Sequence, residues 1–307
     1  MIQEVTPKIR IHVWGGLGSQ LYAWAFLEEL NSRFPNRGKI LVLHTATFSR
    51  RVNELEEFIP EQKIKVIDDF KEGPKNPVFK QVHLHGTKEE GLVRRNFRYF
   101  VSFFKKTLKS FLSTTRLLIV VDSNVSLETI KPWTIWIRGT YYKRKLTTQT
   151  LKKMKEQAKL VGLEFPTRAS DSHEITLHYR LGDLMTIGSK NPIDAKKILD
   201  VSSLMASTLR KKVVRIFSDS PEQVSKFNSS EKIEIVTDRK NLSGRETLYE
   251  LIKAPYFIGT NSKISEWAVI FRLENDVNSY CTIPNYMLEH FEEIYPSISK
   301  ARNLNVY

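Results

Sequence analysis

Cysteine is scarce in this chain of 307 residues, where Cys281 is the only one. A single cysteine excludes an intrachain disulfide and makes a reducing compartment the default expectation. Cys281 lies in the apolar stretch SYCTIP, which favours a small core residue over a reactive nucleophile. The sequence therefore predicts a fold that is held together by packing.

Long hydrophobic runs are also absent. Runs such as LLIVV (Leu117 to Val121) and LYAWAFL (Leu21 to Leu27) fall far short of the ~18–20 apolar residues that a membrane span needs. The first residues, MIQEVTPKIRIHVWGG, lack the basic start and the apolar core of a signal peptide. We therefore expect a cytoplasmic location, with a peripheral position on the inner face of the membrane as an alternative.

Several common catalytic signatures are missing. The seven histidines are scattered, and neither cysteines nor carboxylates complete a zinc pattern beside them. The sequence contains no G-x-S-x-G elbow, and its glycine-rich turn GGLGSQ is not followed by the G-K-[ST] of a Walker loop. These absences argue against a metalloenzyme, an α/β-hydrolase and a P-loop protein.

The charge is strongly one-sided. The chain has 48 lysines and arginines against 34 acidic residues, a net charge of +14. This balance favours an anionic partner, which could be a nucleotide, a nucleic acid or an acidic membrane surface. The cations are spread along the chain and no nucleic-acid-binding motif is present, so a nucleic-acid-binding protein is the least favoured of these hypotheses.

One segment concentrates both charge and aromatic residues. Residues 94–112, RRNFRYFVSFFKKTLKSFL, place apolar side chains at helical spacing with lysines and arginines on the other side. A basic amphipathic helix of this kind is typical of segments that lie on an anionic bilayer. The alternative is that its apolar stripe packs on the protein core, with the lysines in water. The sequence leaves both interpretations open.

Strands and helices alternate along the chain. In the first half, IRIHVW and KILVLHT are predicted strands; IKVI and VFKQVHLH are further candidates. In the second half, predicted strands EITLHYR, VVRIFSD, IEIVTD, YFIGT and SYCTIP alternate with helix-like runs. Such alternation predicts an α/β fold with a parallel sheet in the C-terminal domain. A polar stretch at residues 164–173 marks the predicted boundary, which divides the chain into domains 1–168 and 169–307.

Polar side chains follow the ends of the predicted strands in the second half. Ligands of parallel sheets bind outside the carboxyl ends of the strands, so we expect these side chains to gather there. Hydroxyls and an asparagine before a helix also fit N-caps, and a capped helix N-terminus is itself a phosphate site. The side chains concerned are His178, Arg180, Asp183, Ser218, Asp219, Ser220, Thr237, Asp238, Thr260, Asn261 and Ser262.

Arg180 is the predicted anion ligand at this edge, because a planar guanidinium binds diphosphate oxygens bidentately. Asp183 is predicted either to orient Arg180 or to bind a ribose or base. The turn GGLGSQ (Gly15 to Gln20) predicts a place where the backbone approaches a ligand or another domain closely. A Rossmann dinucleotide site is the competing interpretation, although the spacing is not G-x-G-x-x-G.

Four segments, taken together, resemble the bacterial α-1,2-fucosyltransferases of glycosyltransferase family 11 and the wider fucosyltransferase superfamily. GGLGSQLYAWA (15–25) resembles G-G-L-G-N-Q-L-F-Q-Y-A, and HYRLGD (178–183) resembles the donor motif H-x-R-R-x-D. FSDSPEQV (217–224) resembles the F-S-D-D segment, and FIGTNSKISEWAVIF (257–271) resembles I-x-x-N-S-S-F-S-W-W-A-A-x-L. The segments keep the order of the family and span most of the chain.

The resemblance implies a GT-B-like enzyme with two Rossmann-like domains that face a cleft. Such an enzyme inverts configuration, requires no metal or other cofactor, and binds GDP-fucose in its C-terminal domain. Its acceptor would be a glycan, expected here to contain galactose and to be lipid-linked, in the synthesis of O-antigen or another surface polysaccharide. The N-terminal domain, 1–168, would lie on the acceptor side.

The resemblance also assigns roles to residues. Arg180 would hold the pyrophosphate, and Asp219 would lie near the nucleoside. Asp183 and Glu246 are the candidates for a catalytic base. The further donor contacts would come from His178, Asp183, Ser218, Thr260, Asn261 and Ser262, with Gly15, Gly16, Gly18 and Gln20 lining the cleft from the other domain.

The chain departs from the family pattern at a few positions. Leu181 replaces the second arginine of the donor motif, Ser19 replaces the asparagine of the glycine turn, and Glu266 replaces the first tryptophan of the W-W pair. The usual upstream acidic pair is reduced to Glu246 followed by Thr247. These departures leave two alternatives open: a different nucleotide-sugar donor, or an inactive relative that only binds sugar nucleotide.

Overall fold

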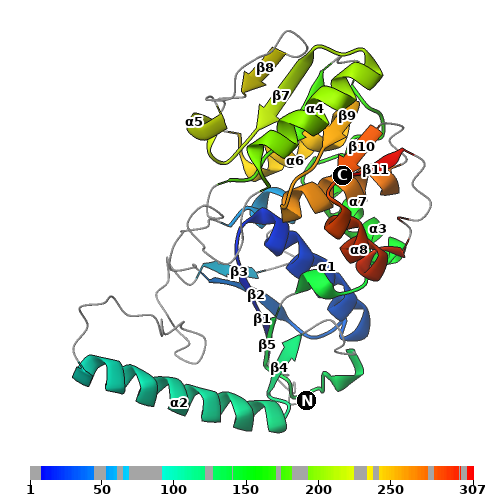
Figure 1. Cartoon of the computed structure of the whole chain (residues 1–307). Coiled ribbons are helices and arrows are strands. Elements are labelled where there is room, and N and C mark those ends of the chain that lie inside the picture. Colours follow the sequence, from blue (N-terminus) through cyan, green and yellow to red (C-terminus); the bar gives the residue numbers. More distant parts are fainter. Residues whose placement is uncertain are drawn as a thin grey trace. The chain divides into compact units, whose positions relative to one another are not determined.

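The structure is a computed structural model of the whole chain (Figure 1). It describes residues 8–44, 53–60, 65–68, 92–121, 127–139, 141–170, 174–181, 193–224, 234–237, 242–275, 280–296, 298 and 303–307. The candidate strand VFKQVHLH, Asp183 and Asp238 lie outside these residues, so they stay predictions.

The chain divides into two compact units, each built from separate segments. The first unit holds residues 1–15, 26–53 and 61–144, and the second holds 16–25, 54–60 and 145–307. This division differs from the predicted boundary at residues 168 and 169. The glycine-rich turn from Gly16 onwards and the helix α3 (Thr148–Leu160) belong to the same unit as the C-terminal sheet.

The first unit contains a five-stranded parallel sheet in the order β3-β2-β1-β5-β4. Ile9, Ile11 and Val13 on one face of β1 and His12 on the other are all buried, as expected for a parallel sheet that is covered on both faces. The strands are β1 (Ile9–Trp14), β2 (Lys39–His44), β3 (Lys65–Asp68), β4 (Leu118–Val121) and β5 (Trp136–Gly139). Within the described residues, the predicted strands IRIHVW, KILVLHT (to His44) and IKVI (from Lys65) are confirmed.

The helical elements among the described residues up to Lys143 are α1 (Leu17–Arg33), α2 (Leu92–Thr114) and three short 3-10 helices, η1 (Leu55–Glu57), η2 (Leu127–Thr129) and η3 (Tyr141–Lys143). Every residue of α1 from Gln20 to Glu28 is buried, which explains why its sequence is apolar on all sides. Its first part, to Ala25, belongs to the second unit and the remainder to the first.

The second unit contains a six-stranded parallel sheet in the order β11-β10-β9-β6-β7-β8. Its strands are β6 (Ile175–His178), β7 (Val213–Phe217), β8 (Glu234–Thr237), β9 (Tyr256–Ile258), β10 (Tyr280–Ile283) and β11 (Leu304–Val306). Counted from β6, this is the 3-2-1-4-5-6 order of the doubly wound nucleotide-binding fold. The α/β class with two parallel sheets is thus confirmed, and the sequence did not suggest β11.

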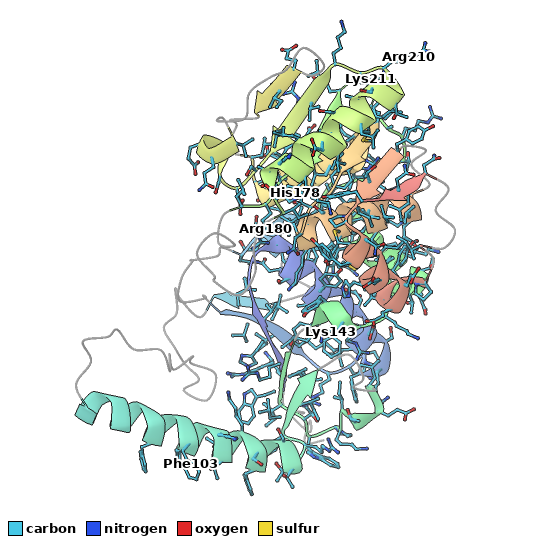
Figure 2. All side chains as sticks on the ribbon, viewed as in Figure 1. Phe103, Lys143, His178, Arg180, Arg210 and Lys211 are labelled. Atoms are coloured by element: carbon cyan, nitrogen blue, oxygen red, sulfur yellow. The ribbon has the colours of Figure 1, made fainter. Side chains whose placement is uncertain are left out.

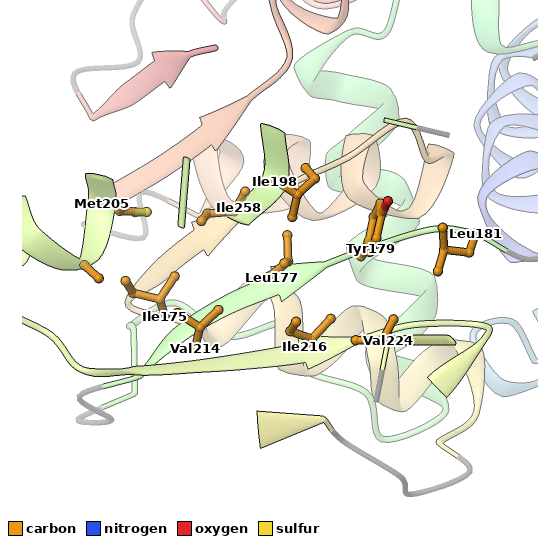
Figure 3. Packing of buried hydrophobic residues seen from close by; sticks show 11 residues of the cluster. Ile175, Leu177, Tyr179, Leu181, Ile198, Met205, Val214, Ile216, Val224 and Ile258 are labelled. Atoms are coloured by element: carbon orange, nitrogen blue, oxygen red, sulfur yellow. The ribbon is translucent and has the colours of Figure 1, made fainter. Parts of the chain in front are cut away.

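Helices alternate with these strands, as predicted. They are α4 (Ala195–Leu209), α5 (Pro221–Val224), α6 (Gly244–Lys253), α7 (Lys263–Glu274) and α8 (Asn285–Ile294). Side chains of β6, β7, β9 and α4 form one core, in which Leu177, Ile216 and Ile258 are fully buried (Figure 3). Burying each such side chain contributes ~1.5–3 kcal/mol, so this core fixes the register of the strands whose ends form the candidate site.

Candidate functional site

The candidate site lies where the strand order of the second sheet reverses. β6 pairs with β9 on one side and with β7 on the other. In a doubly wound sheet the connections on the two sides of this point run over opposite faces, which leaves a crevice outside the carboxyl ends of the two central strands. Three of the predicted polar clusters follow β6, β7 and β9, so the topology brings them to one sheet edge.

His178 is the last residue of β6 and is almost fully buried. Its Nδ1 lies 2.8 Å from Oγ of Ser265 on α7. Burial lowers the pKa of the imidazole from its ordinary 6.5 to about 4; the Asp219 carboxylate opposes this shift and the Arg180 guanidinium adds to it. His178 is therefore neutral at neutral pH and offers hydrogen bonds rather than positive charge.

Thr260 joins the carboxyl ends of β6 and β9. Its hydroxyl donates to the backbone carbonyl of His178 at 2.7 Å and accepts from the backbone N–H of Arg180 at 3.1 Å. Figure 2 shows His178 and Arg180 together at this end of β6. Because the backbone on both sides of Tyr179 is fixed in this way, the half-buried Arg180 leaves the sheet at a defined point.

The loop after β7 supports the same edge. The Asp219 carboxylate accepts the backbone N–H of Leu181 at 2.9 Å, and the Ser218 hydroxyl accepts that of Ser220 at 3.1 Å. Asp219 therefore lies beside the HYRL segment, as the predicted cluster required. Leu181 itself is buried in the apolar core of the sheet, at one end of the cluster in Figure 3. At this position the chain has a core side chain where the resembled motif has an arginine.

The helix α7 begins beside Thr260. Ser262 is its N-cap, with its hydroxyl accepting the backbone N–H of Ile264 at 3.3 Å. The predicted capping role of Ser262 is confirmed, and Asn261 is the partly buried residue before it. Free N–H groups and the helix dipole make the start of a helix favourable for an anion, and α7 has twelve residues.

The glycine-rich turn packs against the start of α7 within the second unit. A Cβ on Gly18 would lie 2.5 Å from Cβ of Lys263 and 2.9 Å from the backbone nitrogen of Ile264. The Gly18 carbonyl also accepts the indole N–H of Trp267 at 3.0 Å. Gly15, with a φ of 105°, adopts a backbone conformation that favours glycine. The prediction that the backbone approaches another element closely is confirmed at Gly18.

The Glu54 carboxylate lies at the N-terminus of α1, the helix that follows this turn. Glu54 accepts the backbone N–H of Leu17 at 2.9 Å and that of Gly244, the first residue of α6, at 3.1 Å. The Gln20 side chain accepts the backbone N–H of Glu54 at 3.1 Å, so Gln20 is buried and faces inward. The predicted donor contacts of Gly15, Gly16, Gly18 and Gln20 stay predictions.

Two side-chain hydrogen bonds complete the contact between α1 and α7. The Tyr22 hydroxyl donates to the Glu266 carboxylate at 2.8 Å, and the Lys263 ammonium donates to the Ser19 hydroxyl at 3.0 Å. Burial raises the pKa of Tyr22, and the neighbouring Glu266 raises it further. Ser19 and Glu266, two positions at which the chain departs from the family pattern, thus each accept a side-chain hydrogen bond in this chain.

Of the two candidates for a catalytic base, the structure describes only Glu246. Glu246 forms a capping box at the start of α6: its backbone N–H donates to the Ser243 hydroxyl at 3.2 Å, and its carboxylate accepts the backbone N–H of Ser243 at 2.8 Å. A structural role accounts for that carboxylate. Asp183 lies outside the described residues, and its role stays a prediction.

Sequence reasoning missed Glu54, Lys263 and Ser265. None of them belongs to a strand end, and the sequence separation of their partners, such as 87 residues between His178 and Ser265, leaves no local signal. The interpretation of Cys281 as a core residue is confirmed. Its free thiol is buried, and burial raises its pKa to about 12, which leaves no thiolate at neutral pH.

No protein-family model matches the sequence, and a search of curated proteins finds no match. Among solved structures, the chain is similar to POFUT1 in complex with GDP, with a TM-score of 0.44 and 10% identity over 91% of this chain and 99% of that chain. It is similar to the E. coli heptosyltransferase WaaC with ADP, with a TM-score of 0.39 and 10% identity over 97% of this chain and 92% of that one.

A third similar structure is the α-1,6-fucosyltransferase NodZ soaked with GDP-fucose, with a TM-score of 0.38 and 14% identity over 86% of this chain and 92% of that one. With identities and TM-scores this low, the fold assignment stands on the strand order of the chain itself, and membership of a fucosyltransferase family stays a prediction.

Proposed function

We propose that the chain is an inverting, metal-independent glycosyltransferase that moves L-fucose from GDP-fucose to a glycan. The acceptor we propose contains galactose and is lipid-linked, as in the synthesis of O-antigen or another surface polysaccharide. The observation that carries the proposal is the reversal point of the second sheet, which has Arg180 and the capped start of α7 at one edge. Described residues of all four motif resemblances, among them Gly18, Arg180, Asp219 and Ser262, support the proposal because they lie at or beside this edge.

In the proposed reaction the nucleotide diphosphate leaves with growing negative charge. Arg180 and the N–H groups at the start of α7 would stabilise that charge where it develops, which makes a metal ion unnecessary. His178, neutral at neutral pH, would donate or accept a hydrogen bond there without adding charge. Asp219 would hold the HYRL backbone in place and lie near the nucleoside. Asp183 is the first base candidate to test, since the Glu246 carboxylate is engaged in its capping box.

The test is release of GDP from GDP-fucose by the purified protein with EDTA present. Wild type is compared with Arg180→Ala and with Arg168→Ala, a matched change of an exposed arginine elsewhere in the second unit. We expect metal-independent release that falls by ~10²–10³ in Arg180→Ala, by analogy with the loss of one oxyanion donor, and is unchanged in Arg168→Ala. Equal rates in all three proteins would contradict the role of Arg180.

A second candidate function is favoured by Leu181. Its side chain lies in the apolar core, so the site lacks one of the two arginines of the resembled donor motif. A donor other than GDP-fucose, or binding of sugar nucleotide without turnover, would follow. GDP-mannose and a UDP-sugar are therefore assayed alongside. Tight GDP binding with no release from any donor, even with galactosides added, would identify an inactive relative.

A further inference from the structure

The helix α2 in the first unit exposes a stripe of phenylalanines. Phe100, Phe104 and Phe111 are 68%, 61% and 62% exposed. At 3.6 residues per turn these three positions fall within an arc of about 40°, so they line one face over more than three turns. Phe103 is also exposed, on the side of α2 that is turned away from the strands (Figure 2). An apolar stripe of this kind has a free-energy cost in water unless something covers it.

A different face of α2 attaches the helix to its own unit. Leu112 is buried against Leu118 of β4, and Leu108 and Trp136 pack around this pair. The phenylalanine stripe therefore stays open although the end of the helix is fixed. Beside that end, Trp133 is 53% exposed and donates its indole N–H to the backbone carbonyl of Thr115 at 3.1 Å. The open surface thus combines several large aromatic side chains on a fixed support.

The charge of α2 has one sign only. The helix contains arginines or lysines at six positions and no acidic residue, in the sequence LVRRNFRYFVSFFKKTLKSFLST. Lys106 is exposed and Lys109 is half-buried, and both lie on the side opposite the phenylalanine stripe. An apolar aromatic face with a cationic face opposite it is typical of helices that lie in the plane of an anionic membrane surface. No described helix is long and apolar enough to cross a membrane.

We propose that α2 docks on an anionic lipid surface through Phe100, Phe104 and Phe111. The phenylalanines enter the boundary between headgroups and acyl chains, and Lys106 and Lys109 on the polar face reach the lipid phosphates. A second copy of this chain is a poorer occupant because each copy carries a net charge of +14. A nucleic acid would match the charge but would leave the phenylalanine stripe in water. The inference does not depend on the proposed sugar transfer.

The test is co-sedimentation of the full chain with vesicles of phosphatidylcholine alone or mixed with phosphatidylglycerol. We expect at least about tenfold stronger binding to the anionic vesicles, because several cations near the surface each contribute to attraction. Changing Phe104→Ser and Phe111→Ser together is expected to weaken that binding about tenfold or more, through lost apolar burial. Lys106→Gln with Lys109→Gln is expected to weaken only the component that depends on anionic lipid.

The matched control replaces two exposed leucines outside α2, Leu160→Ser and Leu204→Ser, which are 63% and 70% exposed. This control should bind like wild type, and the circular dichroism spectrum and the urea-unfolding midpoint should be the same in all variants, which verifies that they fold. The proposal would be overturned by a lack of preference for anionic vesicles, by an equal loss of binding in the leucine control, or by phenylalanine-dependent dimers that do not bind vesicles. An RNA shift without vesicle binding would overturn it in favour of a nucleic-acid partner.

Discussion

His178 combines an ionisable side chain with almost complete burial, and this has a consequence for stability. The unfolded chain binds a proton near pH 6.5, whereas in the folded protein burial lowers the pKa of His178 to about 4. The stability that depends on a neutral His178 is therefore fully present above pH 6.5. It is lost as the pH falls from 6.5 towards 4. A shift of this size corresponds to roughly 3 kcal/mol. We expect the free energy of unfolding, measured with urea at several pH values, to fall over that interval.

The His178→Gln variant tests this cause, since it should start less stable at pH 8 and lose less stability between pH 6.5 and 4. His290→Gln, which changes a histidine on α8, is the matched control. The neighbouring charges, Asp219 and Arg180, oppose each other in their effect on the pKa of His178. If wild type and His178→Gln lost stability in parallel, the buried imidazole would not be the group that titrates.

Residue types at strand ends could be inferred from the sequence, but their contacts could not. Ser262 was identifiable as an N-cap because a hydroxyl precedes an apolar helical run. Glu54 gave no such signal, since it bonds the starts of two helices whose first residues are 37 and 190 positions away. Leu181 looked like a missing site arginine, and only the packing shows that its side chain belongs to the core.

At the scale of the element, the contact between α1 and α7 depends on the small size of Gly18. The Gly18→Ala change would place a methyl group 2.5 Å from Cβ of Lys263 and 2.8 Å from its carbonyl carbon, and the backbone of α7 has no room to move within a packed core. We expect a loss of ~1–3 kcal/mol in the free energy of unfolding from overpacking. GDP release should fall as well, because the start of α7 would shift.

Gly38→Ala is the matched control for this change. A Cβ at position 38 would lie 3.1 Å from Cγ of Lys8, its nearest neighbour. That atom belongs to a flexible side chain that can move away. Urea unfolding of both variants, followed by GDP-release assays, separates the two effects. A Gly18→Ala protein as stable and active as Gly38→Ala would mean that α1 and α7 are not packed as closely as the structure shows.

The alternation of strands and helices was predictable because each β-strand of the second unit is a short apolar run bounded by turn residues. The length of α2 and its attachment were not. Periodicity indicated an amphipathic helix, but both a packed and an open apolar face satisfy that pattern. The structure favours the open face for Phe100, Phe104 and Phe111 and the packed one for Leu112.

At the scale of the whole molecule, the second unit is discontinuous in sequence. Residues 16–25 and 54–60 belong to it together with 145–307. They supply buried apolar side chains at Leu17, Leu21, Tyr22, Trp24, Leu55, Phe58 and Ile59. Each large buried side chain contributes ~1.5–3 kcal/mol, so their sum is comparable with the ~5–15 kcal/mol that stabilises a typical domain.

We therefore expect residues 145–307, expressed alone, to lose the cooperative unfolding transition of the full chain. The measurement is thermal unfolding followed by near-UV circular dichroism, with the full chain in the same buffer as reference. Without residues 16–25, the indole of Trp267 would also lose its hydrogen bond to the Gly18 carbonyl. A fragment that unfolds cooperatively, with a midpoint near that of the full chain, would show that the C-terminal segment is a complete domain.

The sequence by itself determined the α/β class, the parallel sheet of the C-terminal half and the polar residues at its strand ends, because periodicity and turn chemistry are local properties of the chain. The tertiary structure decided which residues meet. In it the glycine-rich turn packs against α7, and Glu54 accepts hydrogen bonds from the first residues of two helices. Leu181 lies in the core, and residues 16–25 belong to the second unit. These outcomes depend on contacts between residues far apart in the chain, for which a single sequence contains no local pattern.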